Sequence, residues 1–348
     1  MPNPKTKPAK QNWANRTLYH GDNLPFLRAM NSESVDLIAT DPPFNKGKDF
    51  HATPDSLAAG AKFQDRWSWE KDVHQDWVDQ ITDDHPRLME AIASARNAHS
   101  DSMGAYICFM AVRLLEMQRL LSPTGSIYLH CDPTASHYLK TALDAIFGWK
   151  QFRNEIVWYY KNASRGKKKL AKSHDVIFWY TKTNQYVFNR ADILAPFTSG
   201  MTAWRYKRGG QSGKEMPKGK TPDDVITLPS LNTMDKERTG FPTQKPLALY
   251  ERFIKTSSNR GDIVLDPFCG CATTLVAAEG LQRQWVGIDI WKGAHKLVNK
   301  RMSDMSKFFD KKSITFTNAP PTRFGAQWAF SDGRIKQNSG WDNRQRVV

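Results

Sequence analysis

The sequence predicts an α/β protein whose core is a doubly wound, mostly parallel sheet with helices on both faces. Apolar segments of strand length alternate along the chain with segments of helical periodicity, which is the order expected of βαβ units. Several strand segments are continuously apolar, as in strands that are buried on both faces. The chain has 348 residues, enough to bury a large core.

Runs rich in β-branched and aromatic residues predict the strands. They span residues 16–22, 35–41, 125–131, 152–160, 175–181, 185–189, 262–268 and 284–290. The segment DVIFWYTKTNQYVFN holds two of these runs, separated only by a short polar stretch. We therefore expect an antiparallel hairpin there, at an edge of the sheet.

Helices are predicted between these strands. In SHYLKTALDAIFG, Leu139, Leu143 and Ile146 recur at helical spacing, and Gly148 is suited to end the helix. The other helical segments are PLALYERFIKTSS, TTLVAAEGLQ and KGAHKLVNKRM. Residues 45–103 and 190–240 break the alternation and are expected to be irregular, and loops of such length are usually functional or disordered.

Composition and charge limit the class of protein. A formal net charge of +15 favours a polyanionic partner, although solubility alone is the simpler reading. No apolar stretch approaches the roughly 20 residues that span a bilayer, so no membrane association is expected. The N-terminus is basic without an apolar centre, unlike a secretory signal. The four cysteines suggest neither a disulfide framework nor a metal site, and a cytoplasmic location fits them.

One predicted strand end suits a nucleoside. The strand at 262–268 contains Asp266, a tight loop carries Gly270, and a helix begins near Thr273. The next strand ends in Asp289, about 20 residues further on, the spacing of a nucleotide-binding βαβ unit. The loop matches neither G-x-G-x-x-G nor a P-loop, so a ligand without phosphates suits it better. Tight packing between strand and helix is the alternative reading.

A second strand end carries the sequence ATDPPF. Pro42 and Pro43 lack backbone donors and cannot continue a strand or a helix, and they follow Asp41 and precede Phe44. Asp41 and the carbonyl of Pro42 are hydrogen-bond acceptors at this strand end, and Phe44 offers an aromatic face beside them. Taken alone, Asp41 could equally be a solvated turn residue.

Together DPPF and DPFCGCATT resemble the motifs of the S-adenosylmethionine-dependent amino-methyltransferases of DNA, specifically their permuted β group. In that group the catalytic D-P-P-[YF] precedes the cofactor loop D-P-F-x-G-x-G-T-T, as it does here. The resemblance continues through LYHGDNLPFL, GSIYLHCD, RNEIVWYYKN and TQKPLALYERFI, over most of residues 16–305. It implies a Rossmann-like methyltransferase fold, S-adenosylmethionine as the cofactor, double-stranded DNA as the partner and no metal.

The resemblance also implies roles for single residues. The catalytic set is Asp41, Pro42, Pro43 and Phe44. Cofactor contacts are expected for the adenine at Asp22, for the methionine moiety at Thr243 and Lys245, for the ribose at Asp289, and along the loop at Asp266, Phe268, Gly270, Thr273 and Thr274. The family's second loop glycine is Ala272 here, which puts a positive φ at that position in doubt.

Domain limits and DNA contacts follow from the same resemblance. We expect a basic tail (1–15), a catalytic half (16–162), an inserted target-recognition region with the hairpin (163–240), a cofactor half (241–310) and a C-terminal extension (311–348). Two basic runs flank the cofactor half and are expected to neutralise phosphates rather than form a merely solvated face. Their residues are Lys161, Arg165, Lys167, Lys168, Lys169, Arg205, Lys207 and Arg208.

The predicted activity is methylation of the N6 amine of an adenine that is flipped out of the duplex. Cytosine-N4 methylation is the nearest alternative, since the same two acceptors suit either amine. In this group the N4 enzymes tend to have Ser in place of Asp41, which favours adenine. A catalytically silent DNA-binding subunit is an alternative of another class. A homodimer and a cognate restriction endonuclease stay open as partners.

Overall fold

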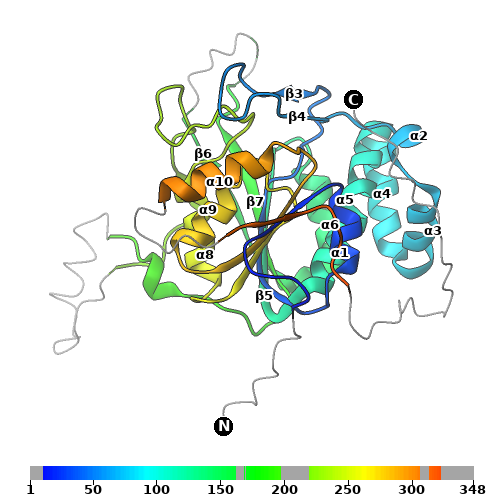
Figure 1. Cartoon of the computed structure of the whole chain (residues 1–348). Coiled ribbons are helices and arrows are strands. Elements are labelled where there is room, and N and C mark those ends of the chain that lie inside the picture. The colour runs from blue at the N-terminus through cyan, green and yellow to red at the C-terminus, as the bar shows by residue number, and fades with distance from the viewer. Residues whose placement is uncertain (1–10, 162–167, 169, 197–218, 306–312, 323–348) are drawn as a thin grey trace, which may run out of the picture.

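The computed structural model describes residues 11–161, 168, 170–196, 219–305 and 313–322. Within these residues the main element is a nine-stranded sheet (Figure 1). Its strands are β1 Thr17–His20, β2 Val35–Thr40, β5 Leu121–Cys131, β6 Phe152–Tyr159, β7 His174–Thr181, β8 Val225–Thr227, β9 Ile263–Asp266, β10 Gln284–Asp289 and β11 Thr315–Thr317. They lie across the sheet in the order β11-β1-β10-β9-β2-β5-β7-β6-β8. Two short strands, β3 (Phe50–His51) and β4 (Lys62–Phe63), form a separate antiparallel pair.

The main sheet is mostly parallel, as predicted. Every neighbouring pair is parallel except the two that involve β7, which runs antiparallel to β5 and to β6. All the other strands of this sheet therefore run in the same direction as β2, and their C-terminal ends lie along one edge, at the top of Figure 1. We call this the carboxyl edge of the sheet.

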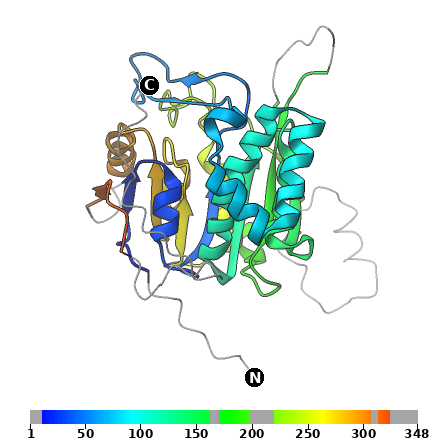
Figure 2. The ribbon, with the colours of Figure 1, turned by 90° about the vertical axis from the view of Figure 1, so that its right-hand side faces the viewer.

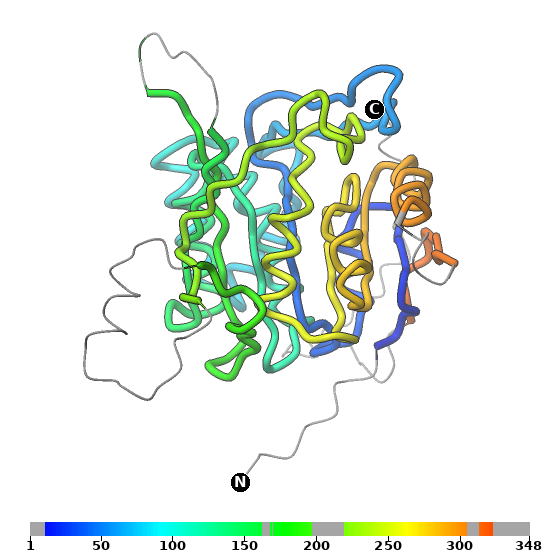
Figure 3. The backbone as a smooth tube through the Cα atoms, turned by 90° about the vertical axis from the view of Figure 1, so that its left-hand side faces the viewer, coloured from blue at the N-terminus to red at the C-terminus, as the bar shows by residue number. Residues whose placement is uncertain are grey.

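Helices cover both faces of the sheet, which confirms the doubly wound architecture. Figure 2 looks onto the face with α1 (Asn23–Ala29), α4 (Pro86–Ala98), α5 (Asp101–Leu120) and α6 (Ser136–Phe147). Figure 3 looks onto the opposite face, where the yellow and orange segments are α8 (Leu247–Ser257), α9 (Thr273–Gly280) and α10 (Ala294–Met305). Each face has its own apolar core, because alternate residues of a strand point to opposite sides. Short elements complete the fold: α2 (Trp69–Asp72), α3 (Gln75–Asp84) and the 3₁₀ turns η1 (Trp149–Gln151) and η2 (Arg190–Ile193).

The predicted hairpin at residues 175–189 is wrong in its second strand. Residues 185–189 form no strand, and β7 lies inside the sheet between β5 and β6. Both edges of β7 are already hydrogen-bonded, so no free edge remains for residues 185–189. Their aromatic side chains instead pack on Trp179 of β7, with ring centroids 5.9 Å away for Tyr186 and 5.8 Å away for Phe188.

The prediction that residues 45–103 are irregular is also wrong. This region contains α2, α3 and α4 and the first residues of α5. Its helices bury only a narrow stripe between many charged residues, such as Trp77 and Ile81 on α3, which weakens the periodic signal. α4 and α5 approach closely at Gly104, where an added Cβ would lie 2.5 Å from Cβ of Arg96. Neither α5 nor any other helix of the described residues is both long and apolar enough to cross a membrane.

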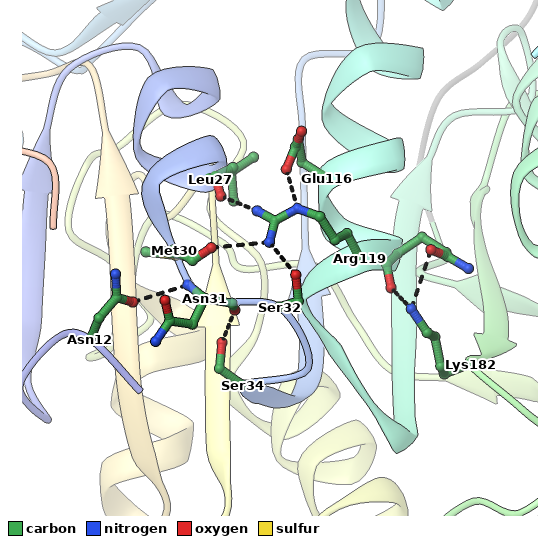
Figure 4. Close-up of polar contacts among 10 residues, drawn as sticks. Asn12, Leu27, Met30, Asn31, Ser32, Ser34, Glu116, Arg119 and Lys182 are labelled. Atoms are coloured by element: carbon green, nitrogen blue, oxygen red, sulfur yellow. Dashed lines mark hydrogen bonds and ion pairs between the residues drawn. The ribbon is translucent and has the colours of Figure 1, made fainter. Parts of the chain in front are cut away.

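Arg119, in the last turn of α5, fixes the C-terminal end of α1 (Figure 4). Its guanidinium donates to the carbonyl oxygens of Leu27 at 2.8 Å and Met30 at 3.0 Å, and to Oγ of Ser32 at 2.9 Å. The carbonyl of Leu27 also accepts from the N–H of Met30, which directly follows α1, so Arg119 adds a second donor where the helix ends. Arg119 thereby holds the turn that leads into β2, the strand that ends next to Asp41.

Candidate active site

Four predicted aspartates meet at the carboxyl edge. Asp266 ends β9 and Asp289 ends β10, while Asp41 directly follows β2 and Asp22 lies just beyond β1. The register between strands aligns them, with His20 beside Asp289 and Gly287 beside Asp266. Residues more than 200 positions apart in the chain therefore form one site, as for Thr40, whose Oγ1 donates to Oδ1 of Asp266 at 2.7 Å.

The loop between β9 and α9 is tightly constrained. Asp266 is buried, its Oδ1 accepts from the backbone N–H of Phe268 at 3.1 Å, and burial raises its pKa to about 7. Gly270 has a φ of 49°, and an added Cβ there would lie 2.9 Å from the ring of Phe241. Ala272, where the family has its second glycine, keeps a positive φ of 63°. The left-handed conformation thus persists in an alanine, at a cost of roughly 1 kcal/mol or more.

Asp289 ties this loop to the end of β10. Its Oδ2 accepts from the N–H of Gly270 and its Oδ1 from the N–H of Trp291, each at 2.7 Å. Burial raises the pKa of Asp289 to about 6, and the two amide bonds oppose that rise. A carboxylate offers about four acceptor positions, so hydroxyl donors of a ligand can still bind here. The next residue, Ile290, has a side chain that is 61% exposed and could cover one face of a heterocycle.

Asp22 is held by an arginine that the sequence analysis missed. Arg113 of α5 is buried and donates to both carboxylate oxygens of Asp22, at 2.9 and 2.8 Å. Its Nε donates to Asn23 at 2.7 Å, and Asn23 donates to the carbonyl of Pro267 at 2.7 Å. This network joins the end of β1 to the loop after β9. A single arginine inside the apolar run CFMAVRLLEM was the only signal of it in the sequence.

Lys245 forms an ion pair with Asp41, whereas the resemblance implied a contact with the cofactor. Its buried ammonium is 2.6 Å from Oδ2 of Asp41 and 3.2 Å from the carbonyl of Thr243. Thr243 has a φ of 59°, which is rare for a β-branched residue. Oδ1 of Asp41 is buried and has no hydrogen-bond partner among the described residues. A buried acceptor without a donor is uncommon and marks a position where a ligand donor would be favourable.

Thr273 and Thr274 begin α9 behind this pair. The hydroxyl of Thr274 donates to the carbonyl of Ala39, at 3.1 Å, and so connects the cofactor loop to β2. The hydroxyl of Thr273 lies 3.4 Å from the carbonyl of Lys245, a long contact. Both threonines are buried and hold the two halves of the site together.

Phe44 is buried against the ring of a histidine, His130. The rings of Phe44 and His130 are stacked with centroids 5.7 Å apart. His130 is buried, and its Nε2 lies 3.1 Å from Oδ2 of Asp175. Burial acts to raise the pKa of Asp175, but the hydrogen bond and the charge of His130 outweigh it and lower that pKa. Trp158 meets His130 edge-on at 5.6 Å and is itself buried, as expected of a core residue.

Most of the predicted DNA contacts lie outside the described residues: Arg165, Lys167, Lys169, Arg205, Lys207 and Arg208. Lys161 and Lys168 are described, and both are exposed. Lys161 follows β6, which is parallel to β8 and shares the direction of β5, so it lies at the carboxyl edge together with Asp41.

The fold and this edge define a nucleoside-binding α/β protein of the Rossmann-like methyltransferase class. A family model described as DNA methylase (N6_N4_Mtase) matches residues 35–300. The chain belongs to this family, and the predicted resemblance is confirmed. The protein is therefore a DNA methyltransferase that acts on an exocyclic amino group, and its cofactor is S-adenosylmethionine.

Relatives agree with this assignment, and solved structures share the fold. Type II methyltransferase M.HpaI of Haemophilus parainfluenzae is 30% identical over 285 residues, which are 82% of this chain and 73% of that protein. DNA adenine methyltransferase YhdJ of Escherichia coli K12 is 29% identical over 295 residues, 84% of each chain. The PvuII DNA methyltransferase, which is cytosine-N4-specific, has the same fold with a TM-score of 0.51, at 16% identity over 88% of this chain and 96% of that one.

The S-adenosyl-L-methionine complex of a DNA modification methylase from Thermus thermophilus is similar to the same degree, with a TM-score of 0.50 and 17% identity over 87% of this chain and 98% of that one. The residues at the carboxyl edge of this protein suit the same ligand. Asp22 and Asp289 present carboxylate acceptors for hydroxyl and amino groups.

Proposed function

We propose that this protein methylates the N6 amine of a specific adenine in duplex DNA. The observation that carries the proposal is the carboxylate of Asp41, of which Oδ2 is held by Lys245 while Oδ1 is buried without a partner among the described residues. An amino group that enters the site can donate a hydrogen bond to Oδ1. The same N–H donor would relieve the cost of the unpaired acceptor, which is about 1–3 kcal/mol for a buried polar group.

The chain's own residues then prepare the amine for reaction. An exocyclic amine is a poor nucleophile, because its lone pair is delocalised into the ring. Hydrogen bonds to Oδ1 of Asp41 and to the carbonyl of Pro42 draw the nitrogen toward tetrahedral geometry and localise that lone pair. Pro42 and Pro43 fix the position of the carbonyl, since their φ angles cannot change. The bound cofactor supplies an electrophilic methyl group on a sulfonium, so positioning and charge can account for catalysis.

Phe44 is the proposed stacking surface for the flipped base. The ammonium groups of Lys46 and Lys245 both lie 4.9 Å from the centroid of its ring, and His130 stacks on it. Lys46 is exposed, whereas Lys245 is buried and paired with Asp41. A base that stacks on Phe44 would therefore displace Lys46, which is free to reach a phosphate of the DNA backbone.

Cofactor binding is proposed for the other half of the edge. Asp289 would accept hydrogen bonds from the ribose and Asp22 from the adenine of the cofactor, and the loop with Phe268 and Gly270 would line the bound cofactor. Arg113 would act indirectly, by fixing Asp22. Thr243 and Lys245 close the site from the side of α8.

Cytosine-N4 methylation is the second candidate, because both acceptors at Asp41 and Pro42 suit that amine as well. The aspartate at position 41 favours adenine through the resemblance described above. DNA as the substrate is supported by family membership and by the net charge of +15. A cytoplasmic location, a homodimer and a cognate restriction endonuclease stay predictions.

One experiment tests the proposed activity directly. The protein is incubated with S-adenosylmethionine and with DNA from a strain that lacks its own methylation, and the DNA is digested to nucleosides for mass spectrometry. We expect N6-methyldeoxyadenosine, at sites that sequencing then maps. Detection of N4-methyldeoxycytidine instead would show that the substrate base is cytosine. Tight cofactor binding without any modified nucleoside would contradict DNA methylation. If the protein neither binds the cofactor nor modifies a nucleoside, it is a silent DNA-binding subunit.

A further inference from the structure

The loop that follows Phe44 is fastened to one buried carboxylate, that of Asp65. Oδ1 of Asp65 accepts from the backbone N–H of Asn45 at 2.6 Å, and Oδ2 accepts from that of Lys46 at 3.1 Å. The carbonyl of Asp65 accepts from the N–H of Gly47 at 2.9 Å. Three successive amides of the loop thus donate to a single residue. Asp65 is only 1% exposed.

The backbone of the loop takes the shape that this arrangement needs. Asn45 has a φ of 61° and Gly47 a φ of 71°, and a positive φ is uncommon for a residue other than glycine. Left-handed residues turn successive N–H groups to one side, which makes a concave binding place for an anion. Here a carboxylate of the chain itself occupies that place. Oδ1 of Asn45 also accepts from Oγ of Ser102 at the start of α5, at 2.9 Å.

This arrangement has energetic costs that a role in stability alone does not explain. Burying a carboxylate is unfavourable unless hydrogen bonds compensate, and burial raises the pKa of Asp65 to about 6 even though the amides of the loop oppose the rise. A left-handed asparagine adds local strain, and such strain persists where the surrounding structure imposes it, often at functional sites. The strain and the buried charge both lie directly beside the catalytic motif.

We propose that Asp65 is a positioning residue for methyl transfer. It holds the loop at 45–47 in place, and this loop directly follows and so positions Phe44, the ring on which the target base would stack. This inference rests on the proposed function, because it assigns a task in base placement.

The test compares Asp65→Asn with Asp49→Asn. The first variant keeps the size of the side chain but removes its charge and one acceptor. The control changes an aspartate of the same segment that pairs with Arg66 at 2.8 Å. Melting temperature, the Kd for S-adenosylmethionine by calorimetry, and kcat and KM on unmethylated DNA are measured for both. A stacking partner that is misplaced by about 1 Å can slow a reaction about 100-fold.

We expect Asp65→Asn to lower kcat roughly 10- to 100-fold, with the Kd for the cofactor within about twofold of wild type and Asp49→Asn near wild type. An unchanged kcat would overturn the proposal, and so would an equal loss in Asp49→Asn or a loss confined to cofactor affinity. A purely structural role would lower the melting temperature without separating kcat from cofactor binding.

A second variant guards against poor folding of Asp65→Asn. Ser102→Ala removes the other tether of Asn45 and leaves no buried charge behind. We expect the same separation, a lower kcat at unchanged cofactor affinity, but smaller. A wild-type kcat in Ser102→Ala together with an unfolded Asp65→Asn would contradict a positioning role. Should the wild-type protein transfer no methyl group to DNA, the proposed function itself fails; should the Asp65→Asn variant transfer it as fast as wild type, only this inference fails.

Discussion

The ammonium of Lys245 lies 2.6 Å from Oδ2 of Asp41, while Oδ1 of the same carboxylate is buried without a partner among the residues that the structure describes. The two residues are 204 positions apart, in the cofactor half and the catalytic half of the chain. Lys245 stands just before α8 and Asp41 just after β2, so the pair joins the two halves at the carboxyl edge. One oxygen of Asp41 is thereby bound within the protein, and we propose that the other accepts a hydrogen bond from the target amine.

Asp41→Ala should abolish methyl transfer and spare cofactor binding. The change removes the proposed acceptor of the target amine and lies outside the loop between β9 and α9. We expect the modified nucleoside to fall below detection and the Kd for S-adenosylmethionine to change less than about threefold. Full activity in this variant would exclude the proposed role of Asp41.

Lys245→Met tests whether the lysine serves Asp41 or the cofactor. Methionine has a similar length but no charge, so Asp41 loses its only hydrogen-bond donor among the described residues. We expect kcat to fall more than cofactor affinity does. The free energy of unfolding should also fall, by about 1–3 kcal/mol, because the carboxylate is left unpaired. The measurements are single-turnover methylation, calorimetry and denaturant unfolding. A loss mainly in cofactor affinity would support the role that the resemblance implied.

Asp289→Ala should weaken cofactor binding strongly. The change removes the proposed ribose acceptor and also the two amide bonds from Gly270 and Trp291. A charge-assisted hydrogen bond contributes roughly 1.5–3 kcal/mol, so the Kd should rise about tenfold to a hundredfold. Calorimetry measures it, and Asp262→Ala, at the start of the neighbouring strand, is the control. An unchanged Kd would show that the ribose binds elsewhere.

Cofactor affinity should fall in acid. Burial raises the pKa of Asp289 to about 6, and only its ionised form accepts two hydroxyl donors well. Protonation of Asp289 alone should therefore leave the affinity unchanged above about pH 6 and lower it by up to about tenfold for each pH unit below that. Asp266, with a pKa of about 7, could begin the decline earlier. Titration calorimetry from about pH 5 to 8 checks this, and in Asp289→Asn the limb near pH 6 should be absent.

Lys161 and Lys168 should contribute to DNA affinity without choosing the sequence. Both are exposed, and a lysine on a flexible stem suits phosphate better than base edges. If each neutralises one phosphate, the double alanine variant should have a slope of log K against log salt that is shallower by about 0.9 per lysine. Lys150→Ala is the control, because Lys150 lies in η1, just before β6, at the end of the sheet opposite the carboxyl edge. Parallel slopes for wild type and double variant would mean that these lysines do not touch the backbone.

Local patterns in the sequence were enough for the alternation of strands and helices and for the residues at the strand ends. Continuous apolar runs predict buried strands such as β2, β9 and β10, and two prolines after Asp41 end a strand whatever lies around them. The same local signals failed where burial is narrow or partners are distant. In α3 a few buried residues lie among many charges, and residues 185–189 alternate like a strand but pack on Trp179.

Only the tertiary structure decided which polar groups meet. Arg113 and Asp22, Lys245 and Asp41, and Asp65 and Asn45 are each joined across 20 or more positions. No periodicity encodes such pairs, because they depend on the order of the strands and on the direction in which each strand leaves the sheet. The sequence by itself thus determined the class of site and its principal carboxylates. Lys245 reaches Asp41 because α8, which begins just after this lysine, packs beside β2, and Oδ1 of Asp41 then has no partner among the described residues.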